Sequence, residues 1–291
     1  MKPVVIVFQF KVSLLKDLDI LIHDCTIVTM DTKQTIIDQG FIAVKNGKIV
    51  NVGKRASSAL SLKAKKKIRG TGKVALPGLV NCHTHVPMTL FRGMAEDKPL
   101  EEWLKETIWP LEAKLRPKDI YDGALLGCLE MIKSGTTCFA DMYFHEEIVA
   151  KAVEKAGLRA VLAEGIIEAS DSARGTKMLN DAIEVAEKFD GYANGRVRVR
   201  LGPHAVYSCS SSLLRKVRES ALKLNVGVHI HLAESMEKAK SLGEVALLEN
   251  INFFTGVNVL AAHCIHLSKE DMRTLVKHGV TAAYNPVANM K

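Results

Sequence analysis

The chain carries two His-x-His pairs, and each pair ends a short apolar segment. His83 and His85 end the segment PGLVNCHTH, and His229 and His231 end the segment VGVHIH. Side chains alternate across a β-strand, so residues two apart point to the same side. Both imidazoles of a pair can therefore reach one metal ion. Taken alone, such a pair is equally compatible with two polar residues at the end of a strand.

Two further histidines end strand-like segments. His204 ends RVRVRLGPH, and His263 lies near the end of NVLAAHC. The C-terminal ends of the strands of a parallel α/β barrel meet on one face, where the active sites of such barrels lie. We therefore expect these histidines to cluster there. The other four of the ten histidines lack this placement, and we interpret them as structural or surface residues.

Neutral imidazoles suit a borderline divalent ion. We expect one such ion, with Zn²⁺ as the first candidate, although iron, nickel and manganese also accept imidazole ligands. An open coordination position would hold a water molecule with a pKa near 7, which supplies a hydroxide nucleophile. Glu234, three residues after His231, is the candidate general acid and base. Its alternative role is that of a first-turn residue in the following helix.

After Gly72, short and nearly continuous apolar runs alternate with helical segments, which is typical of strands buried on both faces of a parallel sheet. The runs are VALPGLVNCHTH, TTCFADM, RAVLAEGI, RVRVRLGPH, VGVHIHLAE, NVLAAHC and VTAAYN. One helical segment, PKDIYDGALLGCLEMIKSG, ends at Gly135, a suitable residue to follow a helix. Its expected buried face consists of Ile120, Ala124, Leu125, Cys128 and Leu129.

This alternation predicts an α/β fold with parallel strands. A (β/α)₈ TIM-type barrel and an open doubly wound sheet both fit. We favour the barrel, because neither a G-x-G-x-x-G nor a G-x-x-x-x-G-K-[ST] phosphate turn is present. A closed barrel needs eight strands and only seven are found. We therefore expect residues 73–291 to form an incomplete barrel that lacks the last strand and the C-terminal part.

The preceding residues have a different character. Residues 17–72 consist of short alternating apolar runs and predict a small β-sandwich-like domain. Asn46-Gly47 predicts a hairpin, because a type I′ turn requires positive φ at both central positions. We interpret residues 1–16 as an N-terminal extension, since their apolar run lacks the length and cleavage site of a signal peptide.

Composition excludes several classes of protein. Hydrophobic residues make up 47% and charged residues 25%, as in a globular domain, and no run approaches the length of a membrane span. The net charge is +8, but the one dense basic cluster, residues 63–69, contains no aromatic residue for base stacking. We expect no binding to nucleic acid or to membranes. The six cysteines stand singly, which favours a reducing cytoplasm.

Five motifs together resemble the amidohydrolase superfamily, and most closely its 5-methylthioadenosine/S-adenosylhomocysteine deaminase branch. They are PGLVNCHTH, GPHAVYSCS, HIHLAES, AAHCIHL and YNPVANMK. The resemblance covers nearly the whole chain and implies a TIM-type barrel of the metallo-dependent hydrolase kind. It further implies hydrolytic deamination of the adenine ring of 5-methylthioadenosine, S-adenosylhomocysteine or 5′-deoxyadenosine, with release of ammonia. The expected partner is this small purine nucleoside, and a homo-oligomer is compatible with the resemblance.

The resemblance also implies roles for individual residues. His83, His85 and His231 match the metal ligands of the family. Glu234 matches the proton shuttle, which protonates a ring nitrogen of the substrate. His263 matches the histidine that orients the metal-bound hydroxide.

The residues that the resemblance places near the nucleoside are Trp103, Glu112 and His204, with Glu112 at the ribose hydroxyls. Without it, Trp103 would be ordinary helix packing and Glu112 a solvated residue. Arg174 aligns with an arginine associated with the amino-acid tail of the substrate. His229 does not match a ligand and is expected to support the site.

Two departures from the family pattern stand out. The family uses an Asp at the end of the eighth strand, which this chain lacks, so a catalytically inactive, truncated remnant is one alternative. Many members carry Arg where this sequence has Glu164, whose carboxylate would disfavour S-adenosylhomocysteine relative to neutral 5′-modified adenosines. A second alternative is an amidohydrolase of another ring, such as guanine, cytosine or a triazine, although Glu112 and His204 argue against it.

Overall fold

The computed structural model describes residues 17–54, 61–94, 98 and 102–290, and the chain divides into two compact units. The first unit is Met1–Gly78 and the second is Leu79–Lys291. The boundary thus falls after Gly78 rather than after residue 72. The extension expected for residues 1–16 lies outside the described residues.

The first unit contains one mixed five-stranded sheet. Its strands are β1 (Leu18–Val28), β2 (Ile36–Lys45), β3 (Lys48–Lys54), β4 (Ala64–Arg69) and β5 (Val74–Ala75). The order is β3-β2-β1-β4, and β5 pairs with β1. Strands β1 and β2 are antiparallel, whereas β4 and β5 run parallel to β1. The buried core of this unit consists of Leu18, Leu21, Phe41, Ala43 and Leu62.

The hairpin predicted at Asn46-Gly47 is confirmed. Strands β2 and β3 are antiparallel, and Lys45 pairs with Lys48 across the two-residue turn. Asn46 has φ 51° and Gly47 has φ 69°, the left-handed conformation that a type I′ turn requires at both positions.

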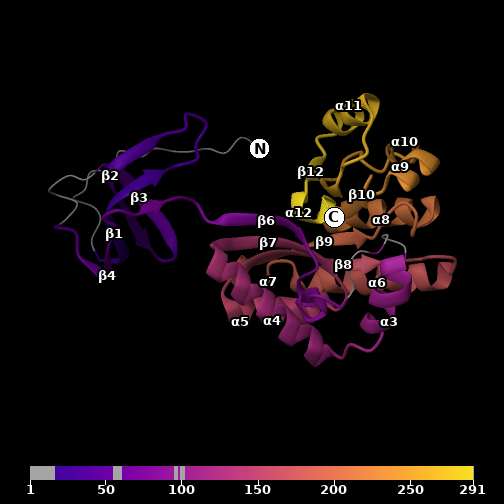
Figure 1. Ribbon diagram of the computed structural model, residues 1–291, viewed down its shortest axis with the longest axis horizontal. Helices are drawn as coiled ribbons and strands as arrows, with labels where there is room; N and C mark the ends of the chain where they lie inside the picture. The colour runs from indigo at the N-terminus through magenta and orange to yellow at the C-terminus, as the bar shows by residue number, and fades with distance from the viewer. Residues whose placement is uncertain (1–16, 55–60, 95–97, 99–101, 291) are drawn as a thin grey trace. The chain divides into compact units, whose positions relative to one another are not determined.

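The second unit is built on a seven-stranded parallel sheet (Figure 1). Its strands are β6 (Leu79–Thr84), β7 (Thr136–Tyr143), β8 (Arg159–Ile166), β9 (Val197–Pro203), β10 (Gly227–Leu232), β11 (Val259–His263) and β12 (Thr281–Ala283). The strands follow one another in chain order from β6 to β12. The seven predicted strands are thus confirmed. They form a nearly closed barrel that is open between β6 and β12 in the part of the chain that the structure describes.

Helices connect the strands and cover the outside of the sheet (Figure 1). They are η2 (Val86–Phe91), η3 (Trp103–Ile108), α3 (Trp109–Glu112), α4 (Pro117–Ser134), α5 (Glu146–Ala156), α6 (Ser172–Phe189), α7 (Tyr192–Gly195), α8 (Ser211–Leu224), α9 (Met236–Leu242), α10 (Glu244–Asn250), α11 (Lys269–Lys277) and α12 (Pro286–Asn289). Phe139 of β7 and Leu162 of β8 join Val149 and Val153 of α5 in one buried cluster. Alternate residues of β7 and β8 therefore face the helices. Every described helix is too short or too polar to cross a membrane.

Helix α4 approaches the 3₁₀ helix η2 closely. Gly123 and Gly127 of α4 are buried, and a Cβ added at Gly127 would lie 2.4 Å from Val86 Cγ2. Leu129, which we expected on the buried face, is 53% exposed, so this part of the prediction is wrong. The buried face includes the two glycines, where an added Cβ would collide with residues of η2. Gly135 ends α4 with φ 86°, as predicted.

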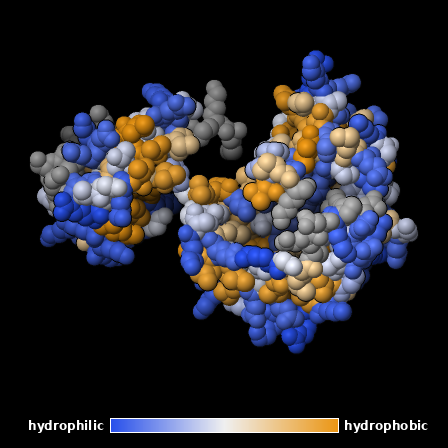
Figure 2. Space-filling view, in the orientation of Figure 1, coloured by the Kyte–Doolittle hydropathy of each residue, from blue (hydrophilic) through white to orange (hydrophobic). Residues whose placement is uncertain are grey.

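Apolar residues also lie on the surface among polar ones (Figure 2). Leu79 and Val80 of β6 are 52% and 61% exposed. Strand β6 has a hydrogen-bonded neighbour, β7, on one side only among the described strands. The exposure at β6 therefore accompanies the open edge of the sheet.

Candidate metal centre and adjoining pocket

Side chains from the C-terminal ends of four strands gather in one cluster. It comprises His83, His85, His204, His229, His231 and His263. The ring centroid of His83 lies 4.8 Å from that of His231 and 5.4 Å from that of His263. The parallel order of the strands explains the cluster, because it brings residues far apart in the sequence to one face.

Three of these imidazoles can share an ion. One nitrogen from each of His83, His85 and His231 lies within 4.8 Å of the other two. The Nε2 atoms of His85 and His231 are 3.3 Å apart. Two nitrogen ligands of tetrahedral zinc, each at ~2.0–2.1 Å from the ion, would be separated by roughly the same distance.

The other ring nitrogen of each of these histidines is already engaged. His85 Nδ1 donates to the carbonyl oxygen of Met142 at 2.5 Å, and His231 Nδ1 donates to that of His204 at 2.8 Å. His83 Nδ1 lies 2.9 Å from Nε2 of His229. The bonds to the two carbonyl groups fix His85 and His231 in the tautomer that leaves the Nε2 lone pair for a metal. Two lone pairs that face each other repel unless a cation lies between them, so the residues fit a divalent ion.

The cluster favours uncharged imidazoles. Burial lowers the pKa of His83 and His231 well below the usual value and also lowers that of His85, and neighbouring histidines add to the effect. Burial lowers the pKa of His204 to about 4 and that of His229 to about 3. Neutral imidazole is the form that binds metal ions, so the cluster would not need to lose protons at neutral pH.

A carboxyl group lies beside the cluster. Glu234 Oε1 is 3.4 Å from Nε2 of His263, whose Nδ1 donates to Asn289 Oδ1 at 3.1 Å. Burial raises the pKa of Glu234, and the attraction of His263 opposes this rise. A raised pKa makes a carboxyl group a better general acid than an exposed carboxylate.

The backbone next to Glu234 is held by a residue outside the histidine cluster. Glu244, at the start of α10, is buried, and its Oε2 accepts a hydrogen bond from the backbone N–H of Ala233 at 2.6 Å. Ala233 has φ 52°, a left-handed conformation that costs free energy in a non-glycine residue. The sharp turn after β10 thus places Glu234 next to His263.

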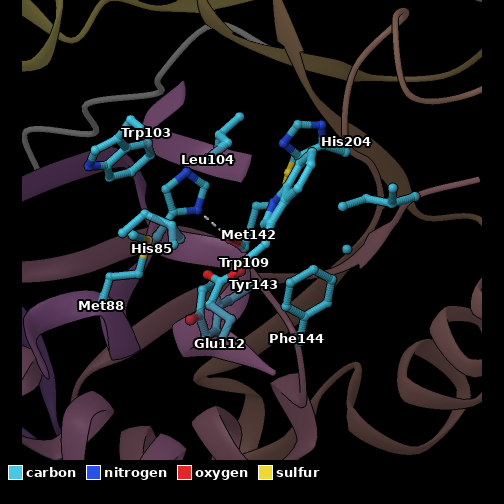
Figure 3. A pocket seen from close by; sticks show the side chains of 13 residues that line it. His85, Met88, Trp103, Leu104, Trp109, Glu112, Met142, Tyr143, Phe144 and His204 are labelled. Carbon is cyan, nitrogen blue, oxygen red and sulfur yellow. Dashed lines mark hydrogen bonds between the residues drawn. The ribbon is translucent and has the colours of Figure 1, made fainter. Parts of the chain in front are cut away.

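A pocket adjoins the cluster (Figure 3). Its lining includes three of the residues predicted to contact substrate, Trp103, Glu112 and His204, together with His85. Arg174, the fourth predicted residue, is exposed in the first turn of α6 and does not line this pocket. Residues 103–112 and the distant ends of β6 and β9 therefore line a common cavity, and no residue of α6 is among its lining.

The rest of the lining is mostly apolar and aromatic, including Trp109, Tyr143 and Phe144. Figure 3 shows the Glu112 carboxyl pointing toward Tyr143. Burial raises the pKa of Glu112, and the neighbouring phenol opposes this shift. Sequence reasoning missed Tyr143 and Phe144. The available signal was an aromatic pair at the C-terminal end of a buried strand, the end at which the histidines of the other strands lie.

Glu164 does not face the pocket. Its carboxylate accepts hydrogen bonds from the backbone N–H groups of His145 at 3.1 Å and Glu146 at 2.8 Å, at the start of α5. Burial raises its pKa to about 7. The next residue, Gly165, lines the pocket, and adjacent strand residues face opposite sides. The geometry gives no support to the repulsion between Glu164 and a substrate carboxylate that the sequence suggested.

Comparisons with known proteins agree with this geometry. Residues 74–291 match the amidohydrolase family. The chain is 47% identical over 279 residues to a 5′-deoxyadenosine deaminase from Methanococcoides burtonii. It is 44% identical over 278 residues to a 5-methylthioadenosine/S-adenosylhomocysteine deaminase from Desulforamulus reducens. Each match covers 94% of this chain, but only 63% and 64% of the respective relative.

A solved structure is also similar. The structure of an adenosine deaminase from Xanthomonas campestris with bound zinc superimposes with a TM-score of 0.82 at 28% identity. The match covers 95% of this chain and 64% of that one. The chain thus spans somewhat less than two thirds of the length of the proteins that it matches.

Proposed function

Because the chain belongs to the amidohydrolase family, we propose that it is a metal-dependent hydrolytic deaminase that acts on the adenine ring of 5′-modified adenosines and releases ammonia. The observation that carries the proposal is the shared wall of the two sites. His85 and His204 belong to the histidine cluster and also line the adjoining pocket. A ring bound in that pocket would therefore lie next to the candidate metal centre.

In this proposal His83, His85 and His231 hold one divalent ion, with zinc as the first candidate. What a bound ion supplies in such a centre is a water molecule that ionises near neutral pH. Glu234 takes a proton from the attacking water and delivers it to the ring nitrogen next to the carbon that bears the amino group. The hydroxyl proton of the resulting tetrahedral carbon then passes to the amino group, the C–N bond breaks, and ammonia leaves as the carbonyl group forms. The position of His263, 3.4 Å from Glu234, suits it to orient the attacking oxygen.

The pocket supports a nucleoside substrate. The aromatic rings of Trp103, Trp109 and Phe144 offer flat apolar surfaces against which a purine can pack. Glu112 provides a carboxyl group that can accept hydrogen bonds from ribose hydroxyls. The described lining contains no lysine or arginine to pair with a carboxylate tail. These walls favour an uncharged 5′ group, as in 5-methylthioadenosine or 5′-deoxyadenosine, over the tail of S-adenosylhomocysteine.

The test is an ammonia-release assay of the purified protein after loading with Zn²⁺. We expect release from 5′-deoxyadenosine and 5-methylthioadenosine and a weaker reaction with S-adenosylhomocysteine. Guanine, cytosine and a triazine should give none. Treatment with a chelator should abolish release, and added Zn²⁺ should restore it. Release from guanine or a triazine alone would refute the substrate class, and no release from any compound would refute the activity.

A further inference from the structure

The turn that follows the first metal-ligand pair is held by two consecutive residues of β7. Asp141 Oδ1 accepts a hydrogen bond from the backbone N–H of Val86 at 2.8 Å. The carbonyl oxygen of Met142 accepts one from Nδ1 of His85 at 2.5 Å. Asp141 thus holds the backbone directly after His85, and Met142 holds the ring of the same histidine. Together the two bonds hold the imidazole ring of His85 and the backbone directly after it.

We propose that Asp141 is a positioning residue of the metal centre, which holds His85 in its ligating position through the backbone N–H of Val86. The proposal rests on the ligand assignment made under the proposed function. Asp141 does not contact the ion itself in this proposal. Its effect passes through one hydrogen bond to the residue next to the ligand.

The local backbone gives this hydrogen bond its importance. Val86 is the first residue of η2, and the first N–H groups of a helix have no partner within the helix. His85 precedes it with φ −122° and ψ 75°, outside the regular helical and extended conformations, and its side chain makes no capping bond. Asp141 therefore supplies the acceptor that the sequence of the turn does not provide.

The surroundings of Asp141 are unfavourable for a carboxyl group whose only role is packing. Asp141 is completely buried, and Phe139 and Tyr143, on the same face of β7, belong to an apolar cluster. Its Oδ2 atom has no hydrogen-bond partner among the described residues. Burying such a group costs free energy, which an apolar side chain would avoid. The bond to Val86 is the feature that distinguishes this position from its apolar neighbours.

The test compares two substitutions of nearly the same size in the purified full chain. Asp141→Asn keeps an oxygen acceptor for the Val86 N–H, whereas Asp141→Val removes it. The control is Glu146→Leu, which removes another fully buried carboxyl group, at the start of α5. Glu146 accepts from the backbone N–H of Tyr143 at 3.0 Å and makes no bond to the metal-ligand turn. The readouts are the Kd for Co²⁺ in competition with a chelator, the visible spectrum of bound Co²⁺, and the Tm.

We expect Asp141→Val to bind Co²⁺ about 10- to 100-fold more weakly with an altered spectrum, as is typical when the partner of a metal ligand is lost. Asp141→Asn should stay within about threefold of the unsubstituted protein, since the acceptor remains. Glu146→Leu should lower the Tm and keep the Co²⁺ affinity and spectrum. Unchanged affinity in Asp141→Val, or a tenfold loss in Asp141→Asn, would overturn the proposal.

The two proposals fail in different ways. If the unsubstituted protein bound no Co²⁺, the assignment of the metal centre would be refuted, and with it the positioning role of Asp141. If it bound Co²⁺ and released no ammonia, only the deaminase activity would fall. The affinities of the Asp141 variants would then still decide the positioning role.

Discussion

Glu234 Oε1 lies 3.4 Å from Nε2 of His263, although the two residues come from the ends of different strands. Burial raises the pKa of Glu234, while His263 opposes that rise. The pair therefore places a carboxyl group of raised pKa next to an imidazole nitrogen. This relationship supports the proposed role of Glu234 in moving protons during the proposed hydrolysis.

We expect Glu234→Gln to lower kcat by roughly 10²-fold or more, because the amide cannot carry a proton between water and substrate. Metal content should stay normal, since Glu234 is not among the three ligands. Steady-state kinetics and elemental analysis of the same preparation check both points. Turnover equal to that of the unsubstituted protein would remove Glu234 from the reaction.

Loss of a metal-ligating histidine should lower the metal content itself. In His231→Ala we expect metal content after dialysis to fall to a small fraction of that of the unsubstituted protein, because two imidazoles hold an ion far less firmly than three. His145→Asn is the matched control, since it replaces a histidine outside the cluster. Asn also tolerates the φ of 59° at that position. Equal metal content in both variants would contradict the ligand assignment.

The buried histidines predict a pH dependence of stability in the metal-free protein. Burial lowers the pKa of His204 to about 4, against about 6.5 in an unfolded chain. Between these values the unfolded state binds a proton that the folded state does not, so His204 destabilises the protein as the pH falls. The effect is about 1.4 kcal/mol per pH unit.

We therefore expect His204→Gln to gain stability relative to the unsubstituted protein between pH 6.5 and pH 4. Above pH 7 the difference between the two should be constant. Urea unfolding in the presence of a chelator, repeated at several pH values, measures the difference. A difference that does not change with pH would show that His204 titrates normally in the folded protein.

Glu164 gives a prediction about specificity. Because its carboxylate binds the N-terminal backbone of α5, we expect Glu164→Gln to leave the ratio of kcat/KM for S-adenosylhomocysteine and 5-methylthioadenosine within about twofold. The matched comparison is Glu112→Gln, whose side chain lines the pocket and which should raise KM for all ribosides. A tenfold shift of the ratio in Glu164→Gln would place that carboxylate near the substrate.

Local rules predicted the parts of the fold that depend on neighbouring residues. The hairpin at Asn46-Gly47 follows from φ preferences, and the seven strands follow from their apolar runs. The clustering of the histidines required only one further step, because parallel strands in chain order bring their C-terminal ends to one face. It predicted that His83 and His231 lie close together, although most of the sequence of the second unit separates them.

Orientation within the barrel strands was harder to predict. Strands buried on both faces show no apolar and polar alternation, so the sequence does not indicate which side chains face the helices. Asp141 and Glu164 both lie on the helix-facing side. The burial of α4 was misjudged at Leu129 for a related reason, since η2 packs against Gly123 and Gly127. The short 3₁₀ helix η2 is an irregular packing partner, so its position cannot be predicted from the periodicity of the α4 sequence.

The contact between His85 and His231 joins residues 146 positions apart in the sequence. His85 directly follows β6 and His231 lies in β10, and these two strands are not adjacent in the sheet. An ion shared by the two would act as a removable cross-link that encloses half of the chain in one loop. Its binding free energy would then contribute to the cooperativity of unfolding of the second unit as a whole. The supply of metal would in that way set how long the folded chain persists.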